Sequence, residues 1–351
     1  MKISLLKHRG GAAVAALVAT TSLASVPLSY AVSSASGSSP VTIGYEYGGD
    51  SALAVALHNK YFQQELGSQV SLKVYESGPA ALSSIASGAL NFICAIGFPP
   101  VISALAQGVP LEIIDAEDQY TTSAGLVATK SSGVTSIAQL KGKKIGLVIG
   151  SQSSFELAQF LKKGGLTPSQ VTQVNLTPPE LQAAFAKGDV DAGLTWSPVY
   201  NAIASSGTVL ATDAILPPTA DSYNVCVANK NWVNAHPGSV NKFLAALNKA
   251  NVFANAHPLI AEQYNATLNG ASLAIAKDIT NGLISPTVPQ QLTSAVLGSS
   301  AATVAQSGVA TSILNNWKVL YADGTITTAP PANASQYIAW SAVAAAVKAL
   351  K

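Results

Sequence analysis

Short apolar runs that resemble strands alternate with helical patterns between residue 41 and about residue 230 of this 351-residue chain. In the helical stretches apolar residues recur at intervals of three and four, whereas the apolar runs are short and bounded by glycine, proline or small polar residues. Strands separated by helices are typical of parallel sheets, so the pattern predicts an α/β fold. The predicted strands are VTIGYEY (41–47), VSLKVYE (70–76), NFICAIG (91–97), PLEIIDAE (110–117), KKIGLVIG (143–150), VTQVNL (171–176) and VDAGLTW (190–196).

Two segments of the chain match each other at an offset of 100 residues. Residues 77–92 and 177–192 align without a gap, and each is followed by an apolar strand and a proline. The matching positions are Pro79 and Pro179, Ala86 and Ala186, Gly88 and Gly188, and Asn91 and Asp191. A chance match is one interpretation; the preferred one is two lobes of similar topology that face one another.

After about residue 236 the pattern becomes helical. Phe243, Leu244, Leu247 and Val252 recur at helical spacing, and no strong strand run follows. We therefore expect the last third of the chain to pack as helices around the first lobe.

The N-terminus has the pattern of a secretory signal peptide. Lys2, Lys7 and Arg9 precede an apolar stretch at 10–28, and small residues follow, so residues 1–35 are predicted to be a signal peptide and flexible lead. A retained membrane anchor is the alternative.

Removing Lys2, Lys7 and Arg9 with the signal peptide would change the formal charge from +2 to −1. A nearly neutral chain gives nucleic-acid binding little electrostatic support.

The two cysteines lie in apolar, strand-like runs. Cys94 and Cys226 are either buried thiols that behave as small apolar residues or, if their strands are adjacent, a disulfide. The sequence contains no CxxC motif, which argues against a redox pair or a structural zinc site.

A turn of small hydroxyl residues joins a predicted strand to a predicted helix at Gly150–Ser154. The start of a helix leaves backbone N–H groups unpaired and carries a partial positive charge, so such a turn suits an anion. An ordinary helix capped by Ser151 or Ser153 is the alternative. Ser77-Gly78 and Gly97 precede helices in the same way, at strand ends where open α/β sheets bind ligands.

The sequence lacks the common catalytic motifs. His58, His236 and His257 lie outside any nucleophile motif, and neither GxSxG nor HExxH occurs. We therefore expect a protein that is not an enzyme and that uses no cofactor and no metal. Glu117 and Asp118 are interpreted as part of a solvated loop.

The motifs that carry a family resemblance are VTIGY (41–45), ALSSIASGALNF (81–92), GVPLEII (108–114), SIAQLKGKKIGL (136–147), SFELAQFL (154–161), VNLTPPELQAAFAKGDVDAGLTWSPVYNAI (174–203) and HPGSVNKFLAALNKA (236–250). In these motifs and their order the chain resembles the periplasmic solute-binding proteins of ABC importers, in the branch for taurine, other alkanesulfonates, nitrate and thiamine-pyrimidine precursors. The taurine-binding members are the most similar, especially across 171–203.

The resemblance implies the periplasmic-binding-protein fold, two α/β lobes joined by two crossovers with a central cleft. Residues 41–125 plus 225–351 would form the first lobe and residues 126–224 the second. The crossovers would fall near Ala124–Thr129 and near Tyr223–Asn229. In this family the returning strand lies beside the strand of Cys94. A disulfide between Cys94 and Cys226 therefore stays one of the two alternatives.

The resemblance also implies a ligand site between the lobes. The candidate ligand-binding residues are Tyr45, Glu46, Tyr47, Ser77, Gly78, Gly97, Phe98, Gln152, Ser153, Ser154, Trp196, Tyr223 and Asn224. Two departures from the family pattern concern the ligand. Gly97-Phe98-Pro99-Pro100 stands where relatives often have Gly-Ser-Ser-Pro, and Asn224 and Ala124 stand where the taurine-binding members carry acidic residues.

These departures lead to a hypothesis about the solute. Compared with taurine, the solute would keep an anionic head and could lack the amine. A larger apolar body would lie against Phe98 and Trp196. Acidic compensation could come from Glu46, Asp50, Glu117 or Asp118, which the sequence does not place.

The function implied is that of an exported, monomeric binding protein in the periplasm or on the extracytoplasmic face. It would capture a small organic anion, taurine or another sulfonate, by hinge closure and deliver it to a membrane permease. The alternatives are a binding protein for nitrate or a thiamine-pyrimidine precursor, or a secreted enzyme on the same fold.

Overall fold

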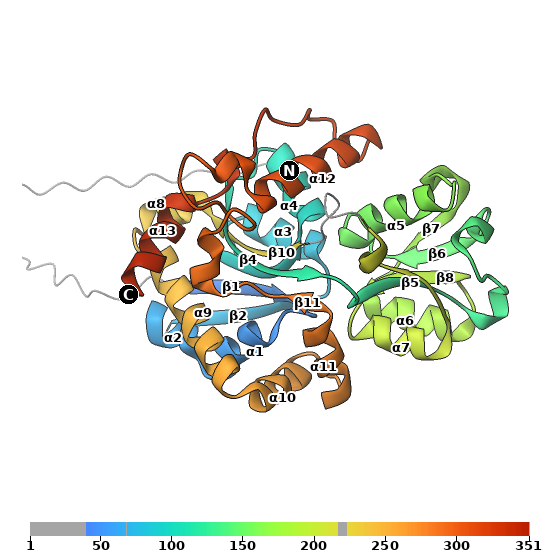
Figure 1. The fold of residues 1–351 in the computed structure, drawn as a ribbon, viewed down its shortest axis with the longest axis horizontal. Coiled ribbons are helices and arrows are strands. Elements are labelled where there is room, and N and C mark those ends of the chain that lie inside the picture. Colours follow the sequence, from blue (N-terminus) through green and yellow to red (C-terminus); the bar gives the residue numbers. More distant parts are fainter. Residues whose placement is uncertain (1–39, 68, 217–222, 351) are drawn as a thin grey trace, which may run out of the picture. The chain divides into compact units, whose positions relative to one another are not determined.

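Two mixed sheets organise the chain (Figure 1). The computed structural model describes residues 40–67, 69–216 and 223–350, which all belong to one compact unit, so the predicted signal peptide lies outside the described residues. We call the part built on the six-stranded sheet lobe one (residues 40–120 and 223–350) and the part built on the five-stranded sheet lobe two (residues 124–216). Among the described helices, none combines the length and apolar character needed to cross a bilayer.

The sheet of lobe one has the order β11-β4-β10-β3-β1-β2. β1 runs parallel to β2 and β3, as predicted, whereas β10 runs antiparallel to both β3 and β4. The sheet is therefore mixed rather than purely parallel. The reason is that β10 enters from lobe two, at the edge of the sheet where β3 and β4 end. The strands are β1 (Val41–Glu46), β2 (Val70–Tyr75), β3 (Phe92–Gly97), β4 (Leu111–Tyr120), β10 (Tyr223–Asn229) and β11 (Leu283–Ile284).

The sheet of lobe two has the order β7-β6-β8-β5-β9. β6 runs parallel to β7 and β8, and β5 runs antiparallel to β8 and β9. The strands are β5 (Ala124–Ala128), β6 (Lys144–Leu147), β7 (Thr172–Asn175), β8 (Ala192–Trp196) and β9 (Thr208–Thr212). The stretches expected to be crossovers are thus the strands β5 and β10. The chain changes sheet before each of them, between Tyr120 and Ala124 and between Thr212 and Tyr223.

Helices cover both sheets (Figure 1). Their bounds are α1 (Ser51–His58), α2 (Tyr61–Leu66), α3 (Gly78–Ala86), α4 (Phe98–Ala106), α5 (Gln152–Lys163), α6 (Pro178–Lys187), α7 (Val199–Ser206), α8 (Lys230–Ala235), α9 (Ser239–Ala256), α10 (Pro258–Leu268), α11 (Leu273–Asn281), α12 (Gly308–Ala322) and α13 (Trp340–Ala349). The helical last third is confirmed, and it packs on lobe one: Phe243 stacks on Phe92 in the core, and Trp317 is buried in the same cluster. Val252, expected on the same stripe, is exposed.

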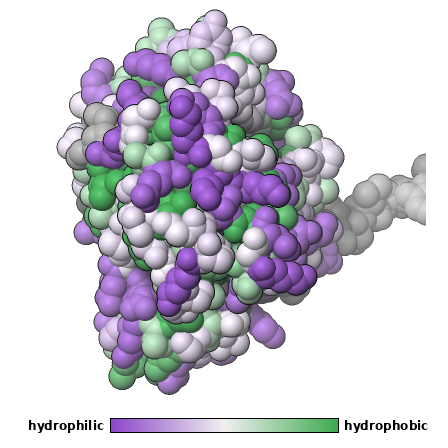
Figure 2. Space-filling model, turned by 90° about the vertical axis from the view of Figure 1, so that its right-hand side faces the viewer, coloured by the Kyte–Doolittle hydropathy of each residue, from purple (hydrophilic) through white to green (hydrophobic). Residues whose placement is uncertain are grey.

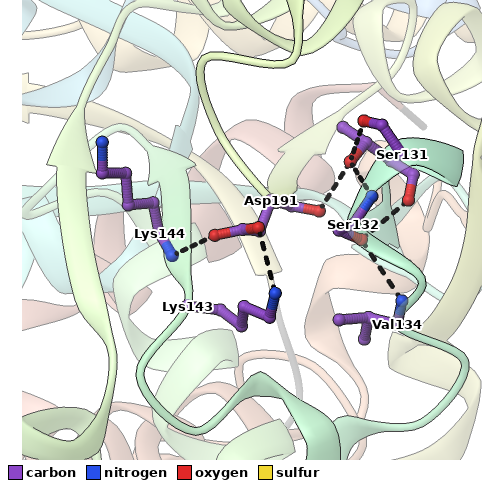
Figure 3. A network of polar contacts seen from close by, with 7 residues as sticks. Ser131, Ser132, Val134, Lys143, Lys144 and Asp191 are labelled. Carbon is purple, nitrogen blue, oxygen red and sulfur yellow. Dashed lines mark hydrogen bonds and ion pairs between the residues drawn. The ribbon is translucent and has the colours of Figure 1, made fainter.

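The internal repeat is visible in the hydrogen bonds of its matching residues. Asn91 Oδ1 accepts from the Thr42 amide at 2.7 Å, and Asp191 Oδ2 accepts from the Lys144 amide at 2.9 Å (Figure 3). The carbonyl oxygens of Asn91 and Asp191 each accept a further amide, from β10 at Asn229 and from beside β5 at Thr129. The two positions therefore lock equivalent strands, β1-β3-β10 in lobe one and β6-β8-β5 in lobe two, which supports two lobes of similar topology.

β3 and β10 lie side by side, as the resemblance implied, and Cys94 and Cys226 form a disulfide across them. The register of this pair shifts between Val225 and Val227, and Ala95 takes a left-handed conformation with φ 57°. Ala95 lies one residue from Cys94 on the strand that leads to the cleft. The disulfide therefore joins the returning strand to the strand whose end borders the cleft.

The face drawn in Figure 2 belongs to the side of the molecule that lies at the right in Figure 1, where lobe two is. Hydrophilic residues are spread over this face, and hydrophobic residues lie among them in small groups. Such a surface is ordinary for a globular protein.

Candidate functional site

A narrow cleft lies where the strand ends of lobe one meet α5 and β8 of lobe two. The cavity at its centre measures about 20 Å³, room for roughly one water molecule. The two lobes are therefore closed on each other at this place. The residues that line it are Glu46, Gly78, Ala95, Gly97, Pro100, Tyr120 and Asn224 from lobe one, and Ala124, Ser151, Gln152, Glu156 and Trp196 from lobe two.

The hydroxyl turn before α5 satisfies much of its own backbone. Ser151 is the N-cap: its Oγ accepts from the Ser153 amide at 3.2 Å and donates to the Val148 carbonyl oxygen at 2.8 Å. Ser154 Oγ accepts from the Gly150 amide at 2.9 Å. The capped helix, the alternative interpretation of this turn, is therefore present, and the Ser154 hydroxyl is directed to the turn itself.

The helix beginnings of lobe one offer few donors. α4 starts with Phe98-Pro99-Pro100, and α3 starts with Gly78-Pro79. Proline has no backbone N–H, so α4 has lost two of its first three donors. The helix N-termini of lobe one therefore offer an anion fewer backbone N–H donors than an ordinary helix start does.

Two glutamates from opposite lobes line the cleft. Glu46 ends β1 and is 6% exposed, and Glu156 lies on α5 and is 1% exposed. Burial raises the pKa of the Glu46 carboxyl well above its usual range. No lysine, arginine or histidine is among the residues that line this cleft. The lining is therefore acidic rather than basic.

Asn224 and Tyr120 connect the lining to a deeper carboxyl. Asn224 Nδ2 donates to Asp118 Oδ1 at 3.1 Å and to the Tyr120 hydroxyl oxygen at 2.9 Å. Burial, followed by Asp118 and then by Glu46 and Glu156, raises the pKa of the Tyr120 hydroxyl well above its usual range. Tyr120 therefore lies within electrostatic reach of both cleft glutamates.

A buried cluster of acids lies along β4 behind the cleft. Asp115, Glu117 and Asp118 are all buried, and burial raises the pKa of each carboxyl well above its usual range. Glu117 Oε2 accepts from the Ala95 amide at 2.6 Å. The solvated loop expected at Glu117 and Asp118 was therefore wrong: both lie in a strand covered on both faces.

The fourth acid of this cluster is Asp50, the N-cap of α1. Its Oδ1 accepts from the Leu53 amide at 2.8 Å. Burial raises the pKa of Asp50 to about 6, although these backbone hydrogen bonds oppose the shift. Asp50 is also near enough to raise the pKa of Asp115, Glu117 and Asp118 further.

The cluster does not form a metal centre around the cysteines. Among the described residues, Cys94, Glu117 and Cys226 are the one group of ligand-type side chains close enough to share an ion. Both sulfurs are in the disulfide, so neither is a thiolate.

Trp196 stands between the cleft and a second, wider pocket. That pocket contains about 510 Å³ and is lined by Tyr47, Pro178, Pro198 and Asn269, among others. Trp196 Nε1 donates to the Tyr47 carbonyl oxygen at 3.2 Å, which joins the two lobes.

Of the candidate residues named from the sequence, the structure brings Glu46, Gly78, Gly97, Gln152, Trp196 and Asn224 together in the cleft lining. The others lie elsewhere. Tyr47 lines the second pocket, Tyr45 packs against the lobe-one core, and Phe98 is fully buried in that core beside Tyr223. Ser77, Ser153 and Ser154 belong to helix beginnings and are outside the lining.

Sequence reasoning missed Ser151, Glu156 and Tyr120 as lining residues. A signal for Glu156 existed: it follows Gln152 by four residues and precedes Phe160 by four, so all three share one helix face. A glutamate on a stripe that is otherwise buried points to a polar interface. Tyr120 ends a strand that the apolar pattern predicted only as far as residue 117.

The comparisons with known proteins agree with this architecture. The chain is 31% identical over 204 residues to the taurine-binding periplasmic protein of Escherichia coli, a match that spans 58% of this chain and 62% of that protein. The alkanesulfonate-binding protein SsuA of Xanthomonas axonopodis, solved with MOPS bound, has a similar fold, with a TM-score of 0.66 at 22% identity over 82% of this chain and 94% of that chain.

An enzyme shares the fold as well. The desulfurization enzyme DszB has a TM-score of 0.62 at 15% identity, over 89% of this chain and 100% of that chain. Residues 51–261 match the model of one family. The periplasmic-binding-protein fold expected from the sequence is thereby confirmed, as is the resemblance to the sulfonate-binding proteins, and the chain belongs to the NMT1/THI5-like family.

Proposed function

We propose that this chain is the extracytoplasmic solute-binding component of an ABC importer, and that it captures a small organic sulfonate such as taurine and delivers it to a membrane permease. The observation that carries the proposal is the cleft itself, which residues from both lobes line and which no single lobe forms. Two of the similar proteins are named for the solutes that they bind, taurine and alkanesulfonates.

The proposed mechanism is hinge closure around the solute. The lobes already approach closely at two places, where the Trp196 indole reaches the Tyr47 carbonyl oxygen and where Gln152 faces Gly97. A solute held between β1 and β10 on one side and α5 on the other would favour the closed arrangement. Closure excludes water, and charges inside then interact more strongly.

The cleft argues against part of the hypothesis about the solute. Phe98 lies in the core rather than beside the cleft, so one of the two aromatic walls expected for a larger apolar body is missing. Trp196 remains as the other. A small solute is therefore favoured over an aryl sulfonate.

The full chain, exported and purified, tests the proposal by calorimetric titration with taurine, ethanesulfonate, nitrate and 4-amino-5-hydroxymethyl-2-methylpyrimidine. Binding of a sulfonate with recovery of the unchanged compound by mass spectrometry is the expected result. Binding of nitrate or the pyrimidine alone would support the other branches of the family instead, and conversion of the sulfonate would identify an enzyme.

A further inference from the structure

We propose that the cleft recognises a cationic nitrogen on its solute, held between Glu46 of lobe one and Glu156 of lobe two. The inference rests on the proposed function and narrows it: the solute would be a small aminosulfonate rather than a simple alkanesulfonate. In this arrangement the positive end of the solute, rather than its anionic head, links the two lobes.

Glu46 is the residue that carries the argument. It is 94% buried, it lines the cleft, and its carboxyl group makes no hydrogen bond or ion pair with the described residues. An ionised carboxylate in such a place is unfavourable unless a cation or several donors reach it. Its partner is therefore expected to enter with the solute.

The chain itself offers no such cation in the cleft. The lining residues include no basic side chain, and the single arginine of the sequence, Arg9, lies outside the described residues. The ion pairs of the described lysines are elsewhere, with Asp191, Glu65 and Glu262.

The amide of Asn224, a donor in the same lining, is already engaged. Its two hydrogens are used by Asp118 and by the Tyr120 hydroxyl oxygen. An amide has only two such hydrogens, so Asn224 cannot serve Glu46 without breaking this arrangement.

Glu156 provides the matching group on lobe two. It reaches the same cleft one helical turn after Gln152, and it influences the same Tyr120 hydroxyl as Glu46 does. Two like charges from opposite lobes oppose closure, whereas a cation between them attracts both. Tyr120 and Trp196 in the same lining are aromatic residues, a type that attracts cations.

This arrangement relocates the acidic groups within the cleft. Asn224 and Ala124 stand where the family resemblance led us to expect acids, and both line the cleft. Glu46 and Glu156 lie in the same lining, on different elements. The compensation left open by the sequence is thus assigned to β1 and α5.

The test is calorimetric titration of the full chain and three variants, Glu46→Gln, Glu156→Gln and the control Glu180→Gln, at one pH and low salt. Glu180 is exposed on α6, where it completes a capping box that glutamine also completes. The probes are taurine and ethanesulfonate, which differ only in the ammonium group. Thermal unfolding of each variant shows that it is folded.

The expected result is that the unaltered chain binds taurine at least tenfold more tightly than ethanesulfonate. Glu46→Gln and Glu156→Gln each lower the taurine affinity at least tenfold and leave ethanesulfonate unchanged or tighter, while Glu180→Gln changes neither. Equal affinity for the two probes, or full taurine affinity in Glu46→Gln, overturns the inference and leaves the proposed function standing.

If the unaltered chain binds no sulfonate, the proposed function fails, and ethanolamine and putrescine then test the inference separately. Binding of either amine that is lost in Glu46→Gln supports the cation site. Absence of binding to both amines overturns it as well.

Discussion

The Trp196 indole of lobe two donates a hydrogen bond to the Tyr47 carbonyl oxygen of lobe one at 3.2 Å. The contact ties the end of β8 to the turn after β1, next to the cleft that Trp196 also lines. It is a hydrogen bond that exists only when the lobes are close, so in the proposed mechanism it would connect lobe closure to solute binding.

Replacing Trp196 by phenylalanine should weaken binding by about two- to tenfold, because one hydrogen bond contributes about 0.5–1.5 kcal/mol. Calorimetric titration measures the loss. Trp340→Phe is the matched control, since the Trp340 indole donates to the Gly298 carbonyl oxygen within lobe one at 2.8 Å. If both variants bind equally well, the Trp196 contact does not contribute to the closed state.

Gly97→Ala should act as a wedge between the lobes. An added Cβ would lie 3.0 Å from Gln152 Cβ and 3.2 Å from Gln152 Oε1, although the backbone at Gly97, with φ −71° and ψ 163°, accepts alanine. We expect about a tenfold loss of affinity and an unchanged or slightly higher melting temperature. In a chain that also carries Gln152→Gly, the same substitution should lower the affinity less. An equal loss of affinity there would show that the loss does not come from contact with Gln152.

Stability should fall as the pH rises. Burial raises the pKa of Asp50 to about 6 from an ordinary value of 3.8, and it raises the pKa values of Asp115, Glu117 and Asp118 in the same direction. Between these ordinary and raised values the folded chain holds more protons than the unfolded chain, so each pH unit costs about 1.4 kcal/mol per affected group. We expect a higher melting temperature at pH 5 than at pH 8.

Glu117→Gln checks the source of this dependence. Glutamine keeps an oxygen for the Ala95 amide and cannot ionise beside Asp115 and Asp118. The variant should be more stable than the unaltered chain at pH 8 and less sensitive to pH, whereas Asp189→Asn on the exposed surface should change neither. A melting temperature that rises from pH 5 to pH 8 would contradict the buried cluster.

Reducing the disulfide should destabilise lobe one. Cys94 and Cys226 are separated by 132 residues, so the bond closes a long loop that includes the whole of lobe two. Loss of such a bond costs about 2–5 kcal/mol. Urea unfolding with and without reductant measures this, and the variant Cys94→Ala/Cys226→Ala should be insensitive to reductant. Equal midpoints for the oxidised and reduced chain would show that the bond is absent or contributes nothing.

Much of the fold was accessible from the sequence because its signals are local. The period of apolar residues marked the strands β1 to β4 and β6 to β8 but not β5, and the repeated Pro, Gly and Asn/Asp positions revealed two related lobes. Asn91 and Asp191 show why that repeat persists: each side chain and backbone occupies the same place in its sheet.

What the sequence by itself determined is therefore the order of elements, the two-lobe plan and the family. Tertiary structure alone decided the character of the cleft. Whether Glu46, Glu156 and Glu117 face water or a closed interior depends on which element of the other lobe or of the returning chain covers them, and Phe98 joins the core for the same reason. Burial and charge environment are set by contacts between residues far apart in the chain, which a local pattern does not contain.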